Sequence, residues 1–69
     1  MTGHVYKHID LTGSSKTSSD DAVSTAIAKA TKSIRGMQWF EVLETRGHIK
    51  AGAVDQWEVT IRVGFTLEG

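Results

Sequence analysis

Residues Gln56–Leu67 read QWEVTIRVGFTL, and this stretch alternates strictly between apolar and polar side chains. An alternation with a period of two is typical of a β-strand with one buried and one exposed face. The apolar side chains that share one face are Trp57, Val59, Ile61, Val63 and Phe65, and the polar ones on the other are Gln56, Glu58, Thr60 and Arg62. The sequence therefore predicts a strand from about Val54 to Leu67 whose polar face meets water, a ligand or another subunit.

Two further strands are expected earlier in the chain. Residues Val5–Leu11 (VYKHIDL) also alternate, with Lys7 as a polar exception on the apolar side. A longer strand begins near Trp39 with WFEVLETRGHI. Between this strand and the last one, KAGAV contains Gly52, a natural hairpin turn residue. The segment Thr12–Asp21 (TGSSKTSSDD) is rich in residues whose side chains bond their own backbone, and we expect it to form a loop.

A single helix is expected from about Asp20 to Arg35. The apolar residues that form a stripe at helical spacing are Val23, Ile27, Ala30 and Ile34. Ser18 or Ser19 can cap the first N–H groups, and Gly36 is a plausible residue to end the helix. The chain thus reads strand, helix, strand, strand: an α+β fold in which one helix packs on one face of a three-stranded antiparallel sheet.

The length of the chain favours self-association. Residues 1–69 form one small domain, and a domain of this size buries only about 60% of the surface that its unfolded chain exposes. Small domains usually compensate with disulfides, a structural metal or oligomerisation, and this chain has no cysteine. We therefore expect a closed homo-oligomer.

Composition argues against several classes of partner. Eight basic and eight acidic residues cancel, which leaves no net field to attract nucleic acid or an anionic membrane. No run approaches the roughly 20 apolar residues of a membrane span, and the start MTGHVYKHID lacks the apolar core of a signal peptide. The expected location is the cytoplasm.

No cluster of chemically active residues is evident. His4, His8 and His48 are scattered and no carboxylate motif joins them, so we expect no metal site. The serines crowd one loop without a histidine and an acid spaced to activate them, and no glycine-rich phosphate loop follows a strand. The sequence predicts a protein that is not an enzyme.

Trp39 is the residue that most needs an explanation. Phe40, Val42 and Leu43 already supply the apolar material of this strand. A large flat ring at its start is either ordinary packing or a platform for another flat ring. Trp57, by contrast, lies on the apolar face of the last strand and is expected to contact the core or another subunit.

The same segments resemble the dodecin family. The resemblance covers nearly the whole chain: VYKHIDLTGSS, an alanine-rich helix, WFEVLETRGHI, GAV and WEVTIRVGFTLE. It implies a hollow homododecamer in which flavins are stacked between tryptophans of symmetry-related subunits. The implied function is a carrier that stores, buffers and photoprotects flavins. The ligand would be FMN or riboflavin, with FAD and coenzyme A as further candidates.

The resemblance also implies the site residues. Trp39 matches the stacking tryptophan, and Arg46 matches the arginine of the bacterial R-G motif, near the flavin. Glu58 stands where most members of the family have a glutamine that pairs with the polar edge of the flavin ring. A carboxylate accepts from the ring N–H but cannot donate to the neighbouring carbonyl unless it is protonated. Gln56, two residues away on the same face, is the reserve candidate.

Alternatives remain for this site. Arg46 can instead pair with Glu41, Glu44 or an acid of a neighbouring chain, and Glu58 can be a solvated strand charge. The competing function is a purely structural homo-oligomer whose slot is empty or holds another flat ligand, such as coenzyme A.

Overall fold

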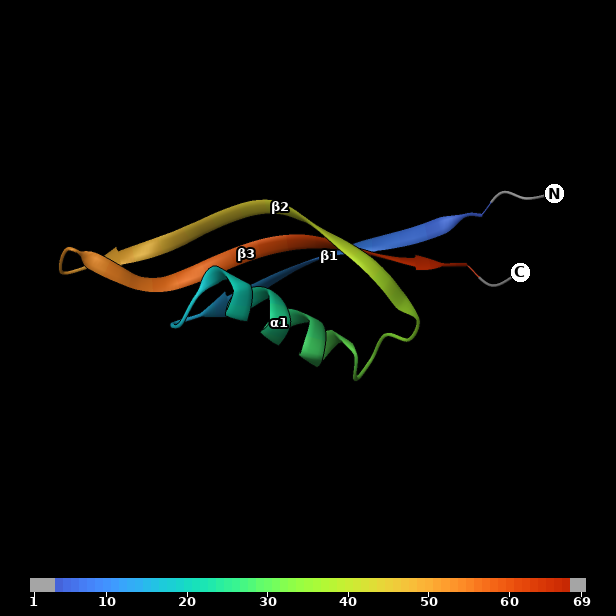
Figure 1. The fold of residues 1–69 in the computed structure, drawn as a ribbon, viewed down its shortest axis with the longest axis horizontal. Helices are drawn as coiled ribbons and strands as arrows, with labels where there is room; N and C mark the ends of the chain where they lie inside the picture. Colours follow the sequence, from blue (N-terminus) through green and yellow to red (C-terminus); the bar gives the residue numbers. More distant parts are fainter. Residues whose placement is uncertain (1–3, 68–69) are drawn as a thin grey trace.

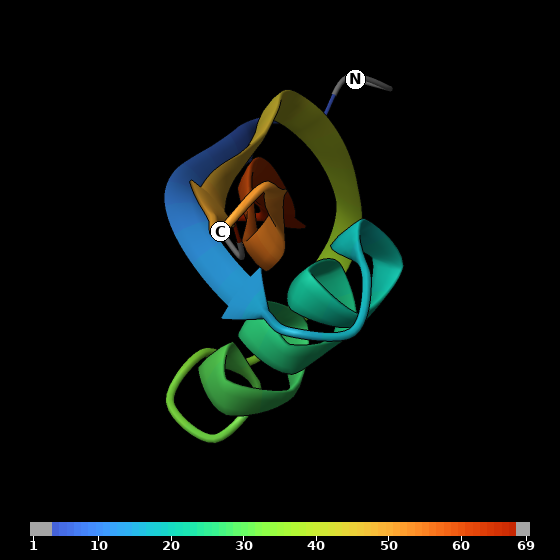
Figure 2. The ribbon, with the colours of Figure 1, turned by 90° about the vertical axis from the view of Figure 1, so that its left-hand side faces the viewer.

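The computed structural model describes residues 4–67, in which three strands and one helix occur in the predicted order. These elements are β1 (Tyr6–Ser15), α1 (Ser19–Ala30), β2 (Met37–Lys50) and β3 (Ala53–Thr66). The helix lies on one side of a curved sheet, and the β2–β3 hairpin extends beyond it (Figures 1 and 2). The α+β, β-α-β-β prediction is therefore confirmed.

The last strand in the chain is the central strand of the sheet. The strand order is β1-β3-β2, and both neighbours of β3 are antiparallel to it. The first strand is longer than predicted, because Thr12–Ser15 does not form a loop but continues β1 and pairs with Trp57–Thr60. The backbone groups of this segment form hydrogen bonds with β3 instead of with their own polar side chains, as a loop of this composition would.

The hairpin turn at Gly52 is confirmed. Ala51 has φ 52° and Gly52 has φ 78°, so both turn residues adopt left-handed backbone conformations. Two consecutive residues with positive φ characterise the tight turn whose twist matches that of paired strands. This turn sets β2 against β3 from Lys50 and Ala53 onward.

The start of α1 is fixed by two serines. The Ser18 side chain accepts a hydrogen bond from the Asp21 N–H at 3.0 Å, as the predicted N-cap requires. The hydroxyl of Ser15, at the end of β1, donates to the Asp21 carboxylate at 2.6 Å and accepts from the Thr17 N–H at 2.9 Å. These bonds join the last residue of β1 to the first turn of the helix.

The helix ends five residues earlier than predicted. Thr31 is the C-cap, and both its N–H and its hydroxyl donate to the Ile27 carbonyl. A side chain that bonds the carbonyl four residues back competes with continued helix. Gly36 has φ 75°, but it lies directly before β2 rather than at the helix end, so its predicted role as the terminating residue was wrong.

The core lies where α1 meets β3. Its fully buried members are Ala22, Val59, Ile61 and Val63. Side chains packed against them come from β1, α1 and the start of β2. Val23 and Ile27 of the predicted stripe belong to this group, whereas Ile34 lies beyond the end of α1. The helix approaches the sheet most closely at Gly13, where a Cβ atom would overlap the Ala22 carbonyl oxygen and lie 2.8 Å from the Ala26 Cβ.

The helix leaves β2 uncovered. It packs on β1 and β3, and every residue of β2 after Met37 is exposed. The molecule is accordingly elongated, with extents of 56 × 21 × 13 Å and a radius of gyration of 14.6 Å. A compact domain of this length has a radius of gyration of about 11 Å. One chain alone therefore leaves much of its apolar surface in water.

We predict that Gly13→Ala destabilises the protein, because the added methyl group pushes α1 away from β1. Overpacking of this kind typically costs about 1–3 kcal/mol. Urea denaturation followed by circular dichroism measures the effect. Ser14→Ala, at the exposed neighbouring position, is the control and is expected to change stability by less than about 0.5 kcal/mol. Equal stability of the two variants would contradict the proposed close contact.

Candidate functional site

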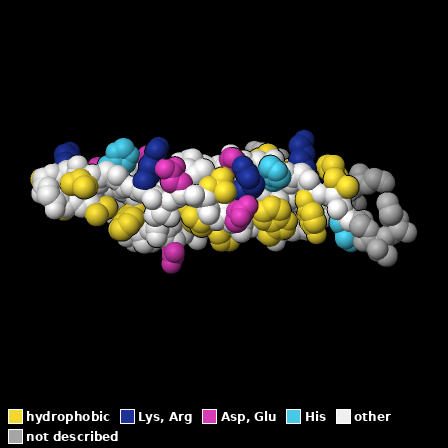
Figure 3. All heavy atoms as spheres, turned by 90° about the horizontal axis from the view of Figure 1, so that it is seen from above, with side chains coloured by type: hydrophobic (Ala, Val, Ile, Leu, Met, Phe, Trp, Pro, Cys, Tyr) yellow, Lys and Arg dark blue, Asp and Glu magenta, His cyan; other side chains and the backbone are white. Residues whose placement is uncertain are grey.

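The site candidates lie on the face of the sheet opposite α1, which we call the polar face. It carries, from all three strands, the side chains Asp10, Thr12, Arg46, His48, Glu58, Thr60 and Arg62, which hydrogen-bond across the strands. Seen from this side, charged and histidine side chains are spread along the length of the molecule (Figure 3). The predicted polar alternation of β3 thus defines a continuous surface.

The first β-bulge determines the partner of Arg46. From the turn onward, Lys50 pairs with Ala53 and Ile49 with Val54, but His48 pairs with Gln56. The extra residue, Asp55, shifts the register by one. Without it Arg46 would lie opposite Trp57, on the helix side, because a shift of one residue moves a side chain to the other face. With it Arg46 lies opposite Glu58.

A second bulge determines the position of Trp39. Val42 pairs with Ile61 and Glu44 with Thr60, so Leu43 is the extra residue on β2. This bulge reverses the register shift made nearer the turn. Trp39 then pairs with Gly64, on the polar face, instead of lying opposite Phe65.

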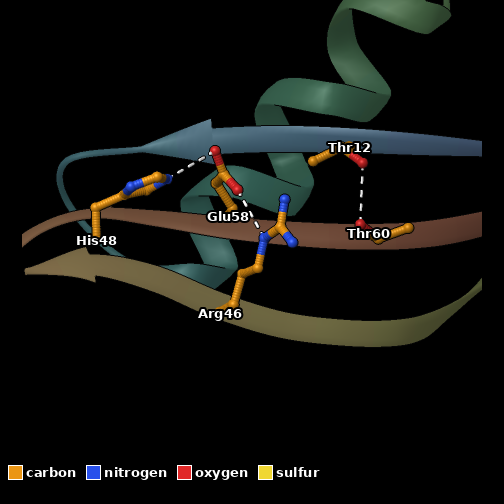
Figure 4. Close-up of polar contacts among 5 residues, drawn as sticks. All are labelled: Thr12, Arg46, His48, Glu58 and Thr60. Atoms are coloured by element: carbon orange, nitrogen blue, oxygen red, sulfur yellow. Dashed lines mark hydrogen bonds and ion pairs between the residues drawn. The ribbon is translucent and has the colours of Figure 1, made fainter.

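Three side chains form an ionic cluster, which we define as Arg46, His48 and Glu58 (Figure 4). The Arg46 Nε donates to Glu58 Oε1 at 2.9 Å, and the His48 Nε2 lies 3.1 Å from Glu58 Oε2. The Glu58 side chain is 20% exposed, whereas those of Arg46 and His48 are 62% and 59% exposed. Glu58 is therefore paired rather than solvated, and Arg46 pairs with it rather than with Glu41 or Glu44.

The cluster keeps Glu58 charged. The hydrogen bond from Arg46, followed by the one from His48, lowers the pKa of the Glu58 carboxyl group. Glu58 in turn raises the pKa of Arg46. Because the folded-state pKa of Glu58 is lowered, the stabilisation from this pair is present above the ordinary glutamate pKa and is lost as pH falls through the lowered value.

Trp39 forms the second part of the site, which we call the aromatic platform. A Cβ atom on Gly64 would overlap the indole ring of Trp39, so this ring lies directly against the Gly64 backbone. Tyr6, from β1, meets it edge-on, with ring centroids 6.2 Å apart and an interplanar angle of 71°. Trp39 remains 38% exposed. The platform is thus supported by the central strand and still accessible.

The two parts are far apart within one chain. Trp39 lies opposite Gly64 and Arg46 opposite Glu58, and the six residues of β3 between these positions span about 20 Å. That distance exceeds the length of the three fused rings of a flavin. The structure therefore brings Arg46 and Glu58 together, and Gln56 lies near them because it pairs with His48. It does not bring Trp39 to this group.

Sequence reasoning missed three residues of this surface. His48 was considered only as a metal ligand, and Tyr6 and Gly64 were given no role beyond their strands. Alternation already placed Tyr6 and Glu58 on polar faces, but the register that joins His48 to Glu58 depends on a bulge. Gly64 carried a signal of its own, since glycine inside a strand often marks a close approach of another group.

Comparisons with known proteins agree on one family. The family model for dodecin matches residues 5–68. The chain belongs to the dodecin family. A dodecin from Thermus thermophilus is 42% identical over 66 residues, which are 96% of each chain. The solved structure of dodecin from Streptomyces coelicolor has 38% identity and a TM-score of 0.90, and the match covers 100% of this chain and 99% of that one.

One relative is described by a different ligand. The structure of calcium dodecin from Mycobacterium tuberculosis, a calcium chelating antigen with a novel calcium-binding site, has 28% identity and a TM-score of 0.78 over 93% of this chain and 91% of that one. In this protein, residues 4–67 contain no group of three or more acidic or histidine side chains placed to hold a metal ion. Within the same range, α1 is too short to cross a membrane.

We predict that Arg46→Leu raises the pKa of the Glu58 carboxyl group, because it removes the strongest of the hydrogen bonds that lower it. An acid titration followed by ¹³C NMR of the side-chain carboxyl carbons measures the change. Arg62→Leu is the matched control, since Arg62 makes the equivalent bond to Asp10 and lowers the pKa of that residue. It is expected to shift Asp10 and leave Glu58 unchanged. A Glu58 titration unaffected by loss of Arg46 would show that the pair is absent in solution.

Proposed function

We propose that the protein is a flavin carrier that stacks the flavin ring on Trp39 at a contact between subunits. The observation that carries this proposal is the aromatic platform: an indole held against the Gly64 backbone, 38% exposed, on the face opposite the helix. An indole buried in a core would not keep this exposure. Membership of the dodecin family supports the same reading, because flavin stacking on the matching tryptophan is the behaviour that the resemblance implied.

The distance between the two parts of the site supports a position between subunits. The aromatic platform and the ionic cluster are about 20 Å apart along β3, so one flavin ring contacts both only if they come from different chains. A twofold axis near Trp39 also pairs this ring with its own copy, which creates a slot with two aromatic walls. A complete site in this proposal therefore needs at least two chains.

The uncovered apolar face of β2 supports assembly into a closed homo-oligomer, and the dodecamer is the state that the family suggests. Phe40 and Val42 are 48% and 50% exposed, and with Val23 and Ile27 of α1 they line a hollow of about 420 Å³. Apolar surface of this kind is usually covered by another subunit. Both outer strands of the sheet, β1 and β2, also have a free edge in the single chain.

A carrier fits the proposed slot better than a catalyst. A flavin between two indoles is shielded from other substrates, and electron exchange with tryptophan quenches its excited state. Storage, buffering and photoprotection follow from this arrangement. Riboflavin and FMN are the proposed ligands, with FAD and coenzyme A as further candidates. The alternative, a structural oligomer with an empty slot, is distinguished by the first experiment below.

We predict that the protein quenches the fluorescence of added riboflavin and that Trp39→Ala removes most of this effect. Stacking of a nucleic-acid base on an aromatic side chain contributes about 1–3 kcal/mol, which serves here as the scale. The expected loss of affinity is about tenfold or more. Fluorescence titration of both proteins measures it.

Trp57→Phe is the control for this experiment, because Trp57 lies on the other face of β3. It is expected to bind riboflavin as well as the wild type does. Unchanged affinity in Trp39→Ala would assign Trp39 to ordinary packing. A wild-type protein that does not bind riboflavin, FMN or FAD would favour the structural oligomer.

We also predict that the wild type has no stable monomer at micromolar concentration and that Val42→Asp shifts it towards smaller species. A charge placed in the hollow between α1 and β2 cannot be buried by a neighbouring subunit without a large desolvation cost. Light scattering coupled to size-exclusion chromatography measures the mass. Glu41→Gln, on the other face of the same strand, is expected to assemble normally. A folded wild-type monomer would overturn the argument.

A further inference from the structure

The strand that carries the aromatic platform starts irregularly. Met37 pairs with Phe65 and Trp39 pairs with Gly64. Gln38, between them, is therefore an extra residue on β2 within this pairing. In a regular strand Met37 and Trp39 would lie on the same face of the sheet. The bulge separates them, so that Met37 packs against the core while Trp39 lies on the polar face. The position of the indole ring thus depends on this bulge.

A side-chain hydrogen bond ties the bulge to the central strand. The hydroxyl of Thr66, on β3, donates to the Gln38 Oε1 at 2.7 Å. A bulged residue is left unpaired in the strand ladder, so this bond is its direct link to β3. Thr66 is itself held in the sheet, because it pairs with Tyr6 on β1. The next residue, Leu67, also donates its N–H to the Val5 carbonyl at 3.0 Å. The end of β3 that carries the bond is therefore anchored.

The Trp39 indole ring also contacts both other strands. β1 begins and β3 ends at the end of the sheet where β2 begins (Figure 1). Tyr6, on β1, meets the indole edge-on, with ring centroids 6.2 Å apart, an arrangement that aromatic pairs prefer. On β3, Gly64 has no side chain, and its backbone lies directly against the ring. The ring is thus held by a neighbour from each strand, while 38% of Trp39 stays exposed.

A held ring is better suited to stacking than a mobile one. A tryptophan side chain on a strand surface has several allowed rotamers when nothing packs against it. A ligand that stacks on such a ring must first immobilise it, and this ordering lowers the affinity. A ring that is already held in the stacking orientation avoids the loss.

We propose that Tyr6 and the Thr66–Gln38 hydrogen bond are positioning elements, which hold the Trp39 indole ring in its stacking orientation before a ligand binds. Both act through Trp39 rather than by touching the ligand. Tyr6 acts through its ring, which packs on the indole. The hydrogen bond acts by keeping the bulge that directs Trp39 to the polar face. The inference rests on the proposed flavin-binding function and assigns a role in it to three uncharged residues.

The first test measures the motion of the Trp39 ring without any ligand. The chain has two tryptophans, so Trp57→Phe leaves Trp39 as the only one. Time-resolved fluorescence anisotropy then reports its local motion, with excitation at the red edge of the absorption band to suppress transfer between subunits. In this background we expect Tyr6→Leu and Thr66→Val to add a fast, nanosecond component to the decay, because exposed side chains move on this timescale. Tyr6→Phe keeps the aromatic contact and is expected to decay like the parent.

Thr60→Val is the matched control for Thr66→Val in this measurement. The Thr60 hydroxyl is hydrogen-bonded to that of Thr12 at 2.9 Å, so this variant also removes one hydroxyl bond between strands. Thr60 pairs with Glu44 on β2, away from the start of that strand. It is expected to leave the anisotropy decay of Trp39 unchanged. Equal fast components in Thr60→Val and Thr66→Val, or none in Tyr6→Leu, would overturn the proposal.

The second test measures affinity by quenching of riboflavin fluorescence. Tyr6→Leu is expected to weaken binding about fivefold and Thr66→Val about threefold. Tyr6→Phe is expected to bind close to the parent, because the ring is kept. The variants are compared at concentrations where light scattering gives each of them the mass of the wild type. Weaker binding without added ring motion would mean that these side chains contact the ligand directly, which overturns a positioning role.

These outcomes separate this inference from the proposed function. A wild type that does not bind riboflavin overturns the flavin-carrier function and this inference with it. A wild type that binds riboflavin through Trp39, but equally well in Tyr6→Leu and Thr66→Val, overturns this inference alone.

Discussion

The pairing of β2 with β3 is the interaction on which the site depends, because it decides which side chains of β2 face away from the helix. Between the turn and Trp39, two bulges act in opposite directions along this pairing. The one at Asp55 brings Arg46 to Glu58, and the one at Leu43 restores the original register before Trp39. Deleting either residue would transfer a site side chain to the helix face. The strand therefore presents both parts of the site on one surface only because it is irregular at both places.

The central position of β3 explains the shape of the chain. Because β3 lies between β1 and β2, the connection from β1 to β2 passes over β3. The helix α1 lies in this connection and packs on β1 and β3. Gly13 and Ala22 allow this close approach. The consequence is a core between α1 and the strands β1 and β3, with the apolar side chains of β2 left uncovered on the same side of the sheet. The apolar surface that makes a single chain incomplete thus follows from the same arrangement that packs its core.

The parts that the sequence predicted are those with a regular period or a local signal. The alternation of β3, the turn at Gly52 and the cap at Ser18 each follow from local rules, and each was found. The end of α1 was missed because the backbone tightens after Thr31, where the N–H groups of Lys32 and Ser33 bond carbonyls three residues back. The apolar stripe does not reveal this change. The extension of β1 was missed because Thr12–Ser15 has the composition of a loop and is held in a strand by its partner on β3.

The site was predictable only in part, for a related reason. Trp39 and Arg46 are seven residues apart, and in an unbroken strand such residues lie on opposite faces. Only the bulge at Leu43 unites them, and nothing in the local sequence requires a bulge there. The resemblance to dodecin supplied these two residues without the geometry. The pairing of His48 with Glu58 had no such support, since it depends on the bulge at Asp55 alone.

The separation of the aromatic platform from the ionic cluster has a thermodynamic consequence for the proposed carrier. If one flavin needs Trp39 from one chain and Glu58 from another, the ligand binds the assembled state and not the isolated chain. A ligand with this preference stabilises assembly by RT ln(1 + [L]/Kd), about 2.7 kcal/mol at a concentration one hundred times Kd. Flavin loading and oligomer stability are then coupled through the same contacts. In this proposal, the same oligomer covers the apolar side of β2 and completes the binding site on the polar side.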